Sequence, residues 1–206
     1  MKKTSILIVD DHAILRMGLS SLINAQTDME VIGDAEDGIQ GVINAKKLRP
    51  DVIIVDLMML EMDGVETTKR IIADNPAAHI LILTSYGTAD ALGHALSAGA
   101  IGAIMKNAPL EELVRAIRSV AAGIRSVAPD IEHILAANPP LPELSPRQFE
   151  ILESLARGLS NPEIATQLDI GCDMVKAHLN ALFHKIGAAN RAEAVAIALR
   201  KHLLKI

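Results

Sequence analysis

The stretch Val52-Ile53-Ile54-Val55-Asp56 decides the fold of the first part of this chain. Its four consecutive β-prone apolar residues predict a strand buried on both faces, as in a parallel sheet. The strand ends in a carboxylate, and open α/β sheets bind their ligands beyond the carboxyl ends of their strands. Asp63-Gly64 predicts a turn a few residues later. Alone, Asp56 is more simply interpreted as a salt-bridge partner or a helix cap, so the other strands have to decide its role.

Strand and helix patterns alternate through the first 120 residues. The expected strands cover residues 5–9, 29–33, 52–56, 79–84 and 101–105. The expected helices cover residues 14–23, 38–48, 65–73, 89–98 and 109–120. Five alternations of this kind predict a five-stranded, parallel, doubly wound sheet of the flavodoxin-like type, with helices on both faces.

The rhythm changes after Gly123. A short helix is expected near residues 131–137, followed by the Pro-rich spacer Asn138-Pro139-Pro140-Leu141-Pro142. From Ser145 onward the pattern is entirely helical, with helices expected over residues 145–157, 161–168, 171–186 and 190–204. The predicted organisation is an α/β domain over residues 1–124, a linker over residues 125–143 and a small four-helix domain over residues 144–206.

Length and composition limit the class of protein. The chain has 206 residues, half of them hydrophobic, which suits one or two domains with cores of their own. Its single cysteine, Cys172, excludes an internal disulfide and fits a reducing compartment. No apolar run has the length of a membrane span. The apolar run near the start of the chain is too short for a signal peptide, and acidic residues follow it at once. We therefore expect a cytoplasmic protein with no membrane partner.

Charge is distributed unevenly along the chain. Residues 1–143 carry 12 Lys and Arg against 19 Asp and Glu, a net charge of −7, whereas residues 144–206 carry 8 against 6, a net charge of +2. The acidic first part argues against nucleic acid as its own partner. The second part is only mildly basic, so its charge alone is weak evidence for DNA binding.

Polar side chains follow the predicted strands. Asp10 and Asp11 follow the first, Asp56 ends the third, Thr84 ends the fourth and Lys106 follows the fifth. Clustered carboxylates repel one another unless a cation neutralises them, and a site made of hard oxygen ligands suits Mg²⁺. Together with Lys106, Mg²⁺ would offset the charge of a phosphoryl group transferred to Asp56, and Thr84 can hydrogen-bond a phosphoryl oxygen.

These residues carry a family resemblance that covers residues 4–122. The motifs that resemble the receiver domain of two-component response regulators are Ile8-Val9-Asp10-Asp11-His12, Asp56 with Asp63-Gly64, Leu83-Thr84-Ser85 and Met105-Lys106. The alternative is an ordinary α/β domain with charged residues at its rim. The resemblance implies a Mg²⁺ site formed by Asp10, Asp11, Asp56 and the backbone carbonyl of Met58. It further implies that Asp56 is the phosphoacceptor, Thr84 the switch hydroxyl and Lys106 the phosphate partner.

The sequence departs from the family pattern at two positions of this domain. Leu60 stands where the family usually has proline, which loosens the loop without removing any chemistry. Ala103 stands where the family usually has the tyrosine or phenylalanine that couples Thr84 to the outer face, which weakens the case for the usual switching mechanism but not for phosphorylation. Tyr86, the only aromatic residue of this domain, is a second candidate: it either couples to Thr84 or shields the phosphoryl group from water. Asp34 is expected to have little effect on the site.

The helical part contains a helix-turn-helix pattern. Residues 161–168, a three-residue turn and the longer helix from Cys172 have the required spacing. One face of the longer helix is apolar, and the opposite face presents Asp173, Lys176, Ala177, Asn180 and Lys185. Lysine and asparagine can read guanine and adenine edges in the major groove, and alanine can contact a thymine methyl group. A solvated charged face explains the same pattern equally well.

A second resemblance favours DNA. The motifs that look like the LuxR-type DNA-binding domain are Leu144-Ser145-Pro146-Arg147-Gln148, Gly158-Leu159-Ser160-Asn161, Glu163-Ile164-Ala165, Val175-Lys176-Ala177-His178 and Asn190-Arg191-Ala192-Glu193-Ala194. With the receiver in front, nearly the whole chain is similar to the NarL/FixJ subfamily of response regulators. This resemblance implies base contacts from Lys176, Ala177 and Asn180, and a homodimer formed through the last helix.

Three departures concern the helix-turn-helix. Pro162 replaces a common lysine and removes a phosphate contact, although proline suits a first helical turn. Residues 171–174 replace the usual cap, and Asp173 would face the DNA backbone and repel it. Cys172 lies at a helix start, where the dipole lowers a thiol pKa, so a redox switch is conceivable. We favour the simpler interpretation of Cys172 as a small, partly buried helix-start residue.

Three function classes follow from these features. The favoured one is a DNA-binding response regulator, in which a sensor histidine kinase phosphorylates Asp56 and thereby controls dimerisation and transcription. The alternative is a phosphorylation-independent DNA-binding regulator that uses the receiver as a dimerisation module. An aspartate-nucleophile phosphohydrolase is disfavoured, because Met58 stands where such enzymes have their second acid. We expect only self-phosphorylation from a phosphodonor and slow hydrolysis of the aspartyl phosphate.

Overall fold

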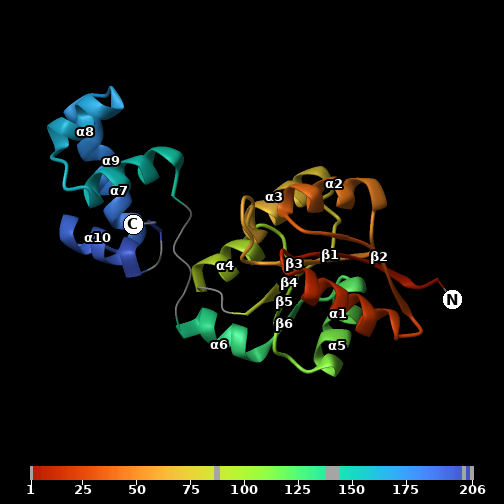
Figure 1. Ribbon diagram of the computed structural model, residues 1–206. Coiled ribbons are helices and arrows are strands. Elements are labelled where there is room, and N and C mark those ends of the chain that lie inside the picture. The colour runs from red at the N-terminus through yellow and green to blue at the C-terminus, as the bar shows by residue number, and fades with distance from the viewer. Residues whose placement is uncertain (1, 86–88, 138–143, 201–202, 205–206) are drawn as a thin grey trace. The chain divides into compact units, whose positions relative to one another are not determined.

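The computed structural model describes residues 2–85, 89–137, 144–200 and 203–204 (Figure 1). The chain divides into two compact units, Met1–Pro140 and Leu141–Ile206. Two expectations, the Pro-rich spacer over residues 138–142 and the role of Tyr86, lie outside the described residues.

The first unit is built on a parallel sheet. Its strands are β1 (Thr4–Val9), β2 (Met29–Ala35), β3 (Val52–Asp56), β4 (Ile80–Thr84), β5 (Gly102–Met105) and β6 (Ser126–Val127). Their order in the sheet is β2-β1-β3-β4-β5-β6, and all of the pairs are parallel. The prediction of five strands is therefore wrong by one. Strand β6 has only two residues, too few to produce a periodic signal in the sequence.

Helices cover both faces of this sheet, as the alternation predicted. They are α1 (Ala13–Asn24), α2 (Gly38–Leu48), α3 (Gly64–Asp74), α4 (Ala89–Ser97) and α5 (Leu110–Ala121). Residues of α2, α3 and α4 pack in one core cluster and those of α1 and α5 in the other. Strand β3 lies between the two clusters, with Ile53 and Val55 in the first and Val52 and Ile54 in the second. The predicted burial of this strand on both faces is confirmed.

The first unit continues past residue 124, where the sequence placed its end. The backbone N–H of Ser126 donates to the Ile101 carbonyl and that of Ala128 donates to the Ala103 carbonyl, both at 2.9 Å. The helix α6 (Pro129–Ala137) follows directly, and its fully buried Ile131 belongs to the same core cluster as Ala103. Most of the predicted linker therefore packs on the sheet.

Small residues on β5 make room for this extra layer. A Cβ atom added at Gly102 would lie 3.0 Å from the Ser126 carbonyl oxygen and 2.8 Å from Leu81 Cδ1. Ala103 is completely buried. Because protein interiors are close-packed, an aromatic ring at position 103 would displace part of the packing around Ile131. The departure at Ala103 thus has a structural counterpart in the layer formed by β6 and α6.

The second unit contains four helices in its described part, as expected. They are α7 (Pro146–Ala156), α8 (Asn161–Leu168), α9 (Cys172–Ile186) and α10 (Arg191–Arg200). The core cluster between them includes Leu152, Ile164, Val175 and Leu182. Ser145 and Gln148 form a reciprocal capping box at the start of α7, and Gly187 ends α9 with φ 72°, in the left-handed region that glycine adopts readily. Among the described residues, no helix has both the length and the apolar character that a bilayer crossing requires.

Candidate functional site

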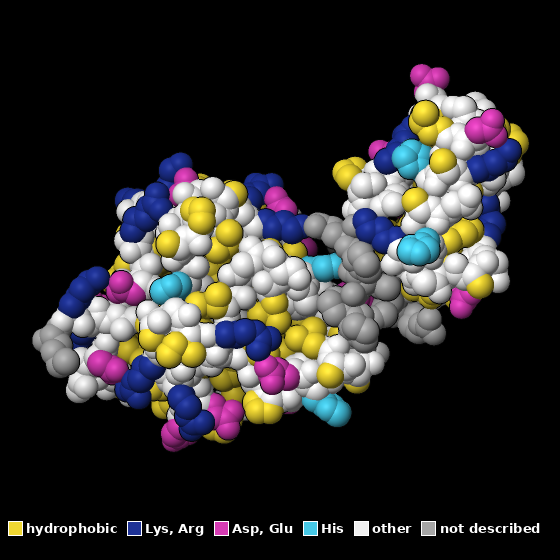
Figure 2. Space-filling model, turned by 180° about the vertical axis from the view of Figure 1, so that it is seen from behind, with side chains coloured by type: hydrophobic (Ala, Val, Ile, Leu, Met, Phe, Trp, Pro, Cys, Tyr) yellow, Lys and Arg dark blue, Asp and Glu magenta, His cyan; other side chains and the backbone are white. Residues whose placement is uncertain are grey.

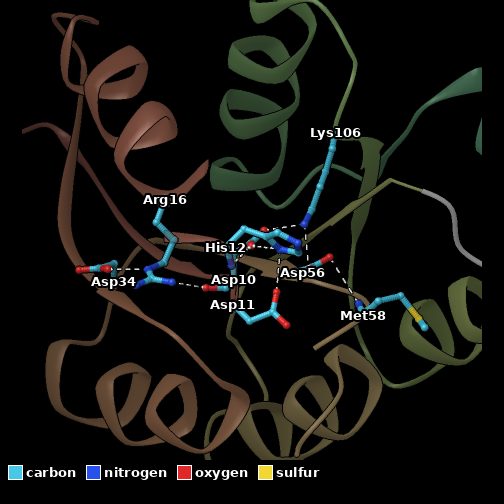
Figure 3. A network of polar contacts seen from close by, with 8 residues as sticks. All are labelled: Asp10, Asp11, His12, Arg16, Asp34, Asp56, Met58 and Lys106. Carbon is cyan, nitrogen blue, oxygen red and sulfur yellow. Dashed lines mark hydrogen bonds and ion pairs between the residues drawn. The ribbon is translucent and has the colours of Figure 1, made fainter. Parts of the chain in front are cut away.

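Buried polar side chains meet at the carboxyl ends of the central strands of the sheet (Figure 3). Asp10 follows β1, Asp56 ends β3, Thr84 ends β4 and Lys106 follows β5. The parallel register pairs Asp56 with Leu83 and Thr84 with Met105, so these strands end at nearly the same level. The sequence therefore predicted correctly which side chains share this edge, because parallel strands carry their ends to one rim.

One ammonium group bridges two of the carboxylates. Lys106 Nζ lies 2.8 Å from Asp10 Oδ2 and 2.9 Å from Asp56 Oδ2, and both aspartates are almost completely buried. Burial raises the pKa of Asp56, although Lys106 offsets part of this effect. Burial also tends to lower the pKa of Lys106, but its hydrogen bonds to Asp10 and Asp56 outweigh burial and raise that pKa. Two buried anions thus share a single cation.

Asp11 and His12 complete the acidic group. His12 Nδ1 lies 2.7 Å from Asp11 Oδ1 and 3.1 Å from Asp10 Oδ1. Each of Asp10, Asp11, His12 and Asp56 offers one potential ligand atom, and these four atoms lie within 4.8 Å of one another. The donor set therefore fits a small divalent cation, since three carboxylates with one ammonium leave negative charge unbalanced.

Arg16 contacts the backbone of Asp10 from outside the acidic group. The Arg16 guanidinium donates through Nη1 to the backbone carbonyl of Asp10 at 2.7 Å and through Nε to Asp34 Oδ2 at 2.8 Å. Figure 3 shows Arg16 between these two residues. The structure thus connects Asp34 to the pocket, a connection that the sequence analysis missed because neither residue belongs to a motif.

The loop after Asp56 is shaped by a close backbone approach. A Cβ atom added at Gly64 would lie 2.3 Å from the Asp56 carbonyl oxygen, so only glycine fits without rearrangement. The preceding Asp63 caps α3 by accepting a hydrogen bond from the Glu66 backbone N–H at 2.8 Å. Asp63-Gly64 is therefore more than a turn, because it brings the start of α3 against the phosphoacceptor candidate. In the loop between Asp56 and Asp63, Glu61 adopts φ 64° next to the exposed Leu60.

Two further predicted site residues, Thr84 and Met58, make few hydrogen bonds in the pocket. The Thr84 hydroxyl is completely buried and has no hydrogen-bond partner among the residues that the structure describes. The backbone N–H of Met58 lies 3.4 Å from Asp56 Oδ1, at the long limit for a hydrogen bond. The part that the Met58 carbonyl plays in binding a metal stays a prediction.

The predicted DNA-reading residues on α9 fall into two groups. Lys176, Ala177 and Asn180 are all exposed. Lys185 is half-buried, and its ammonium lies 3.3 Å from Gln148 Oε1 on α7. At about 100° per residue, Lys185 is turned about 180° from Lys176 around the helix axis. The structure therefore brings the first three residues together and separates Lys185 from them.

The exposed face of α9 carries an ion pair of its own. Lys176 Nζ lies 2.9 Å from Asp173 Oδ1, and the hydrogen bond to Asp173 raises the pKa of Lys176. Asp173 does not cap α9, because Gly171 occupies the cap position and no side chain bonds to it. A groove of about 250 Å³ beside this face is lined by Asn161, Lys176, Asn180 and Arg191, among other residues. Arg191 was quoted within a motif but was not singled out, because nothing in the sequence places α10 beside α9.

Two more features concern the surface of the second unit. Cys172 is exposed, so the interpretation of it as a partly buried residue is wrong. The cap residue Gly171 leaves the start of α9 open to solvent. In the view of Figure 2, the lysine and arginine side chains described on this unit lie at separate places, as expected from its small net charge.

Together, the parallel sheet with its acidic pocket and the helix-turn-helix unit define a DNA-binding response regulator. Residues 6–118 match the family described as response regulator receiver domain, and residues 142–198 match bacterial regulatory proteins of the luxR family. The chain belongs to these families and, by its relatives, to the NarL/FixJ type of response regulator. These families and relatives support the role of a DNA-binding regulator.

Similar proteins extend over nearly the whole chain. The transcriptional regulatory protein LiaR of Bacillus subtilis is 36% identical over 207 residues, which cover 97% of this chain and 98% of LiaR. The oxygen regulatory protein NreC of Staphylococcus carnosus is 38% identical over 213 residues, covering 97% of this chain and 98% of NreC. Among solved structures, the response regulator ChrA of a heme-sensing two-component system is 34% identical, with a TM-score of 0.59 and coverage of 99% of this chain and 100% of ChrA.

Proposed function

We propose that a sensor histidine kinase phosphorylates Asp56 and that this modification controls dimerisation and DNA binding. The observation that carries the proposal is the bridge from Lys106 to the buried carboxylates of Asp10 and Asp56 at the sheet rim. Receiver domains serve as substrates of histidine kinases in two-component systems, and the match of residues 6–118 to this family supports the proposal.

The residues of the pocket divide the chemistry between them. An Asp56 oxygen forms the new bond to phosphorus while the bond between phosphorus and the donor's atom breaks. Asp10, Asp11, Asp56 and the Met58 carbonyl would hold Mg²⁺, which supplies charge neutralisation for the phosphoryl oxygens. Lys106, now shared between two carboxylates, would transfer one of its contacts to the phosphoryl group. The buried Thr84 hydroxyl is available to donate a hydrogen bond to the same group.

DNA recognition is assigned to the exposed face of α9. Lys176 and Asn180 have the donors and acceptors that read guanine and adenine edges, and Ala177 is small enough to meet a thymine methyl group. Their exposure on one side of a helix that follows a short turn supports this assignment. Lys185 is a weaker candidate, because Gln148 holds its ammonium.

Exposed apolar side chains support a homodimer. On α1, Ile14 is 87% exposed and Met17 is 74% exposed, and on α10 Leu199 is 41% exposed. Contiguous exposed apolar side chains mark surfaces that bind another molecule, and Ile14 and Met17 are neighbours three residues apart on α1. We propose that phosphorylation brings two copies of the chain together through surfaces of this kind.

One observation favours a second candidate function. Ala103 stands in place of the switching aromatic, and the space beside it is packed by β6 and α6. The alternative is therefore a regulator that dimerises and binds DNA without phosphorylation.

A single experiment separates the two functions. The protein is incubated with Mg²⁺ and acetyl phosphate, and its binding to DNA fragments selected by the protein is compared with that of untreated protein. The proposal predicts one hydroxylamine-labile phosphoryl group and tighter DNA binding, both of which Asp56→Asn lacks. Labelling of Asp56→Asn equal to wild type would contradict the assignment of the site. Equal DNA binding with and without the phosphoryl group would favour the second function.

A further inference from the structure

The pocket contains a nitrogen donor that the proposed function does not use. The imidazole Nδ1 of His12 lies 2.7 Å from Asp11 Oδ1 and 3.1 Å from Asp10 Oδ1. His12 precedes α1 as its cap residue, yet its side chain makes no capping hydrogen bond. Its backbone N–H donates to Asp10 Oδ1 at 2.8 Å, which fixes the turn that carries the ring. The ring therefore lies beside the carboxylates and is not used to cap the helix (Figure 3).

The distances match those between ligand atoms of one metal ion. An octahedral ion with bonds of about 2.1 Å holds neighbouring ligand atoms about 3.0 Å apart and opposite ones about 4.2 Å apart. The His12 contacts of 2.7 and 3.1 Å fall close to the first value. The outer limit of 4.8 Å for the whole group requires a contraction of only about half an ångström to reach the second value.

Lys106 contacts only one oxygen of each of the two buried carboxylates. Its ammonium contacts the Oδ2 atoms of Asp10 and Asp56, whereas His12 contacts the Oδ1 atoms of Asp10 and Asp11. The His12 side chain is 66% exposed, so the proton that lies between Nδ1 and the carboxylates can leave to water when an ion takes its place. A metal ligand needs the neutral form of imidazole.

We propose that His12 Nδ1 is an additional metal ligand and makes the pocket prefer divalent transition ions over Mg²⁺. Imidazole nitrogen suits the later transition ions, such as Co²⁺ and Ni²⁺, whereas Mg²⁺ takes oxygen ligands almost exclusively. The inference rests on the proposed function, because the ion occupies the same phosphoacceptor pocket, and it names the class of ion. His12 thereby acts as a specificity-determining residue.

A different role for His12 gives a different expectation. A histidine that only neutralises the carboxylates competes with every divalent ion alike. Its removal then changes the affinities for Mg²⁺ and for Co²⁺ by the same factor. A ligand role changes the ratio of the two affinities, because only Co²⁺ gains from the nitrogen.

The test measures this ratio on the full-length protein. Dissociation constants for Mg²⁺ and Co²⁺ are determined by titration calorimetry for wild type, His12→Gln and His12→Ala, and thermal unfolding verifies that each variant is folded. Only the Co²⁺ binding that Mg²⁺ displaces is counted, since thiol and imidazole groups elsewhere on the protein are also able to bind cobalt. The control is His133→Gln, which changes an exposed histidine on α6 of the same unit.

The inference predicts that His12→Gln weakens Co²⁺ binding about tenfold or more and Mg²⁺ binding less than about threefold. The visible absorption of bound Co²⁺ should change in the same variant, and His133→Gln should match wild type in both respects. Equal factors for the two ions, or no change, would overturn the ligand role. A wild-type protein that binds Mg²⁺ but gains no phosphoryl group at Asp56 would instead contradict the proposed function alone.

Discussion

Two ion pairs of the same length lie in very different surroundings. Lys106 and Asp56 are 2.9 Å apart in the pocket, where their side chains are 11% and 3% exposed. Lys176 and Asp173 are also 2.9 Å apart on α9, where their side chains are 62% and 95% exposed. Water screens the second pair, so it contributes little to stability. The first pair is desolvated, so removing one member leaves an uncompensated charge.

The comparison explains how each unit is suited to its partner. Buried carboxylates that share one ammonium leave negative charge unbalanced, and a metal ion would neutralise it. The exposed pair on α9 is cheaply broken, so Lys176 can exchange Asp173 for a DNA group. Ion pairs of equal length therefore need not have equal energies, because the energy depends on how far the pair is buried.

The largest expected effect is on stability and concerns the buried ion pair. Lys106→Met should lower the free energy of unfolding by about 3 kcal/mol at neutral pH without metal, because two carboxylates then lack a cation. Lys176→Met should leave this free energy nearly unchanged, because water already screens the exposed pair. Urea unfolding followed by circular dichroism measures both values. Similar small losses in the two variants would mean that water solvates the pocket as freely as it does α9.

The second effect concerns DNA. Lys176→Ala should weaken binding to a selected sequence by about 1–3 kcal/mol, because a base contact is lost. The matched control is Lys185→Ala, whose ammonium is held by Gln148 and should leave the sequence preference unchanged. Gel shifts against selected and scrambled DNA give both values. A larger loss of preference from Lys185→Ala would reverse the assignment of the two lysines.

The third effect concerns Asp34, which contacts the pocket only through Arg16. Asp34→Asn should weaken Mg²⁺ binding by about threefold to tenfold, because Arg16 then loses the partner that orients it toward the Asp10 carbonyl. The control is Glu36→Gln, an exposed acid two residues away. Calorimetry should distinguish the two variants. If they weaken binding equally, the effect is one of overall charge and the Arg16 contact has no part in it.

The fourth effect is a pH dependence. Because burial raises the pKa of Asp56, the folded state binds this proton more tightly than the unfolded state does. The ionised carboxylate therefore destabilises the metal-free protein, and this loss of stability develops as the pH rises through the folded-state pKa. Asp56→Asn should melt at a higher temperature than wild type at pH 7 without metal, and the two should converge in acid. A variant that melts lower at pH 7 would show that Lys106 outweighs burial.

The smallest expected effect is on DNA binding and concerns the exposed ion pair on α9. Asp173→Ser removes a charge that opposes DNA phosphates and releases Lys176, so DNA binding should tighten by a few tenths of a kcal/mol at low salt. The gain should disappear at high salt, where screening removes the repulsion. Titrations of binding at several salt concentrations measure the trend. Weaker binding by this variant would mean that Asp173 itself contacts a base.

Much of the pocket could be predicted from the sequence. A strand buried on both faces is a continuous apolar run, and a polar residue directly after such a run has to lie at the rim of a parallel sheet. For this reason Asp10, Asp56, Thr84 and Lys106 were placed together correctly. The four helices described in the second unit could also be predicted, because signals such as the capping residue Ser145 mark helix starts.

Only the tertiary structure decided the features that depend on contacts between distant residues. Arg16 joins Asp34 to the Asp10 carbonyl, and Lys185 meets Gln148, 37 positions away in the chain. Strand β6 exists because β5 offers it an open edge beside Gly102 and Ala103. Local periodicity reports which face of an element is apolar, but not which other element covers that face. The sequence therefore determined the chemistry that gathers at the rim, whereas packing decided which side chains orient it and which remain free to meet DNA.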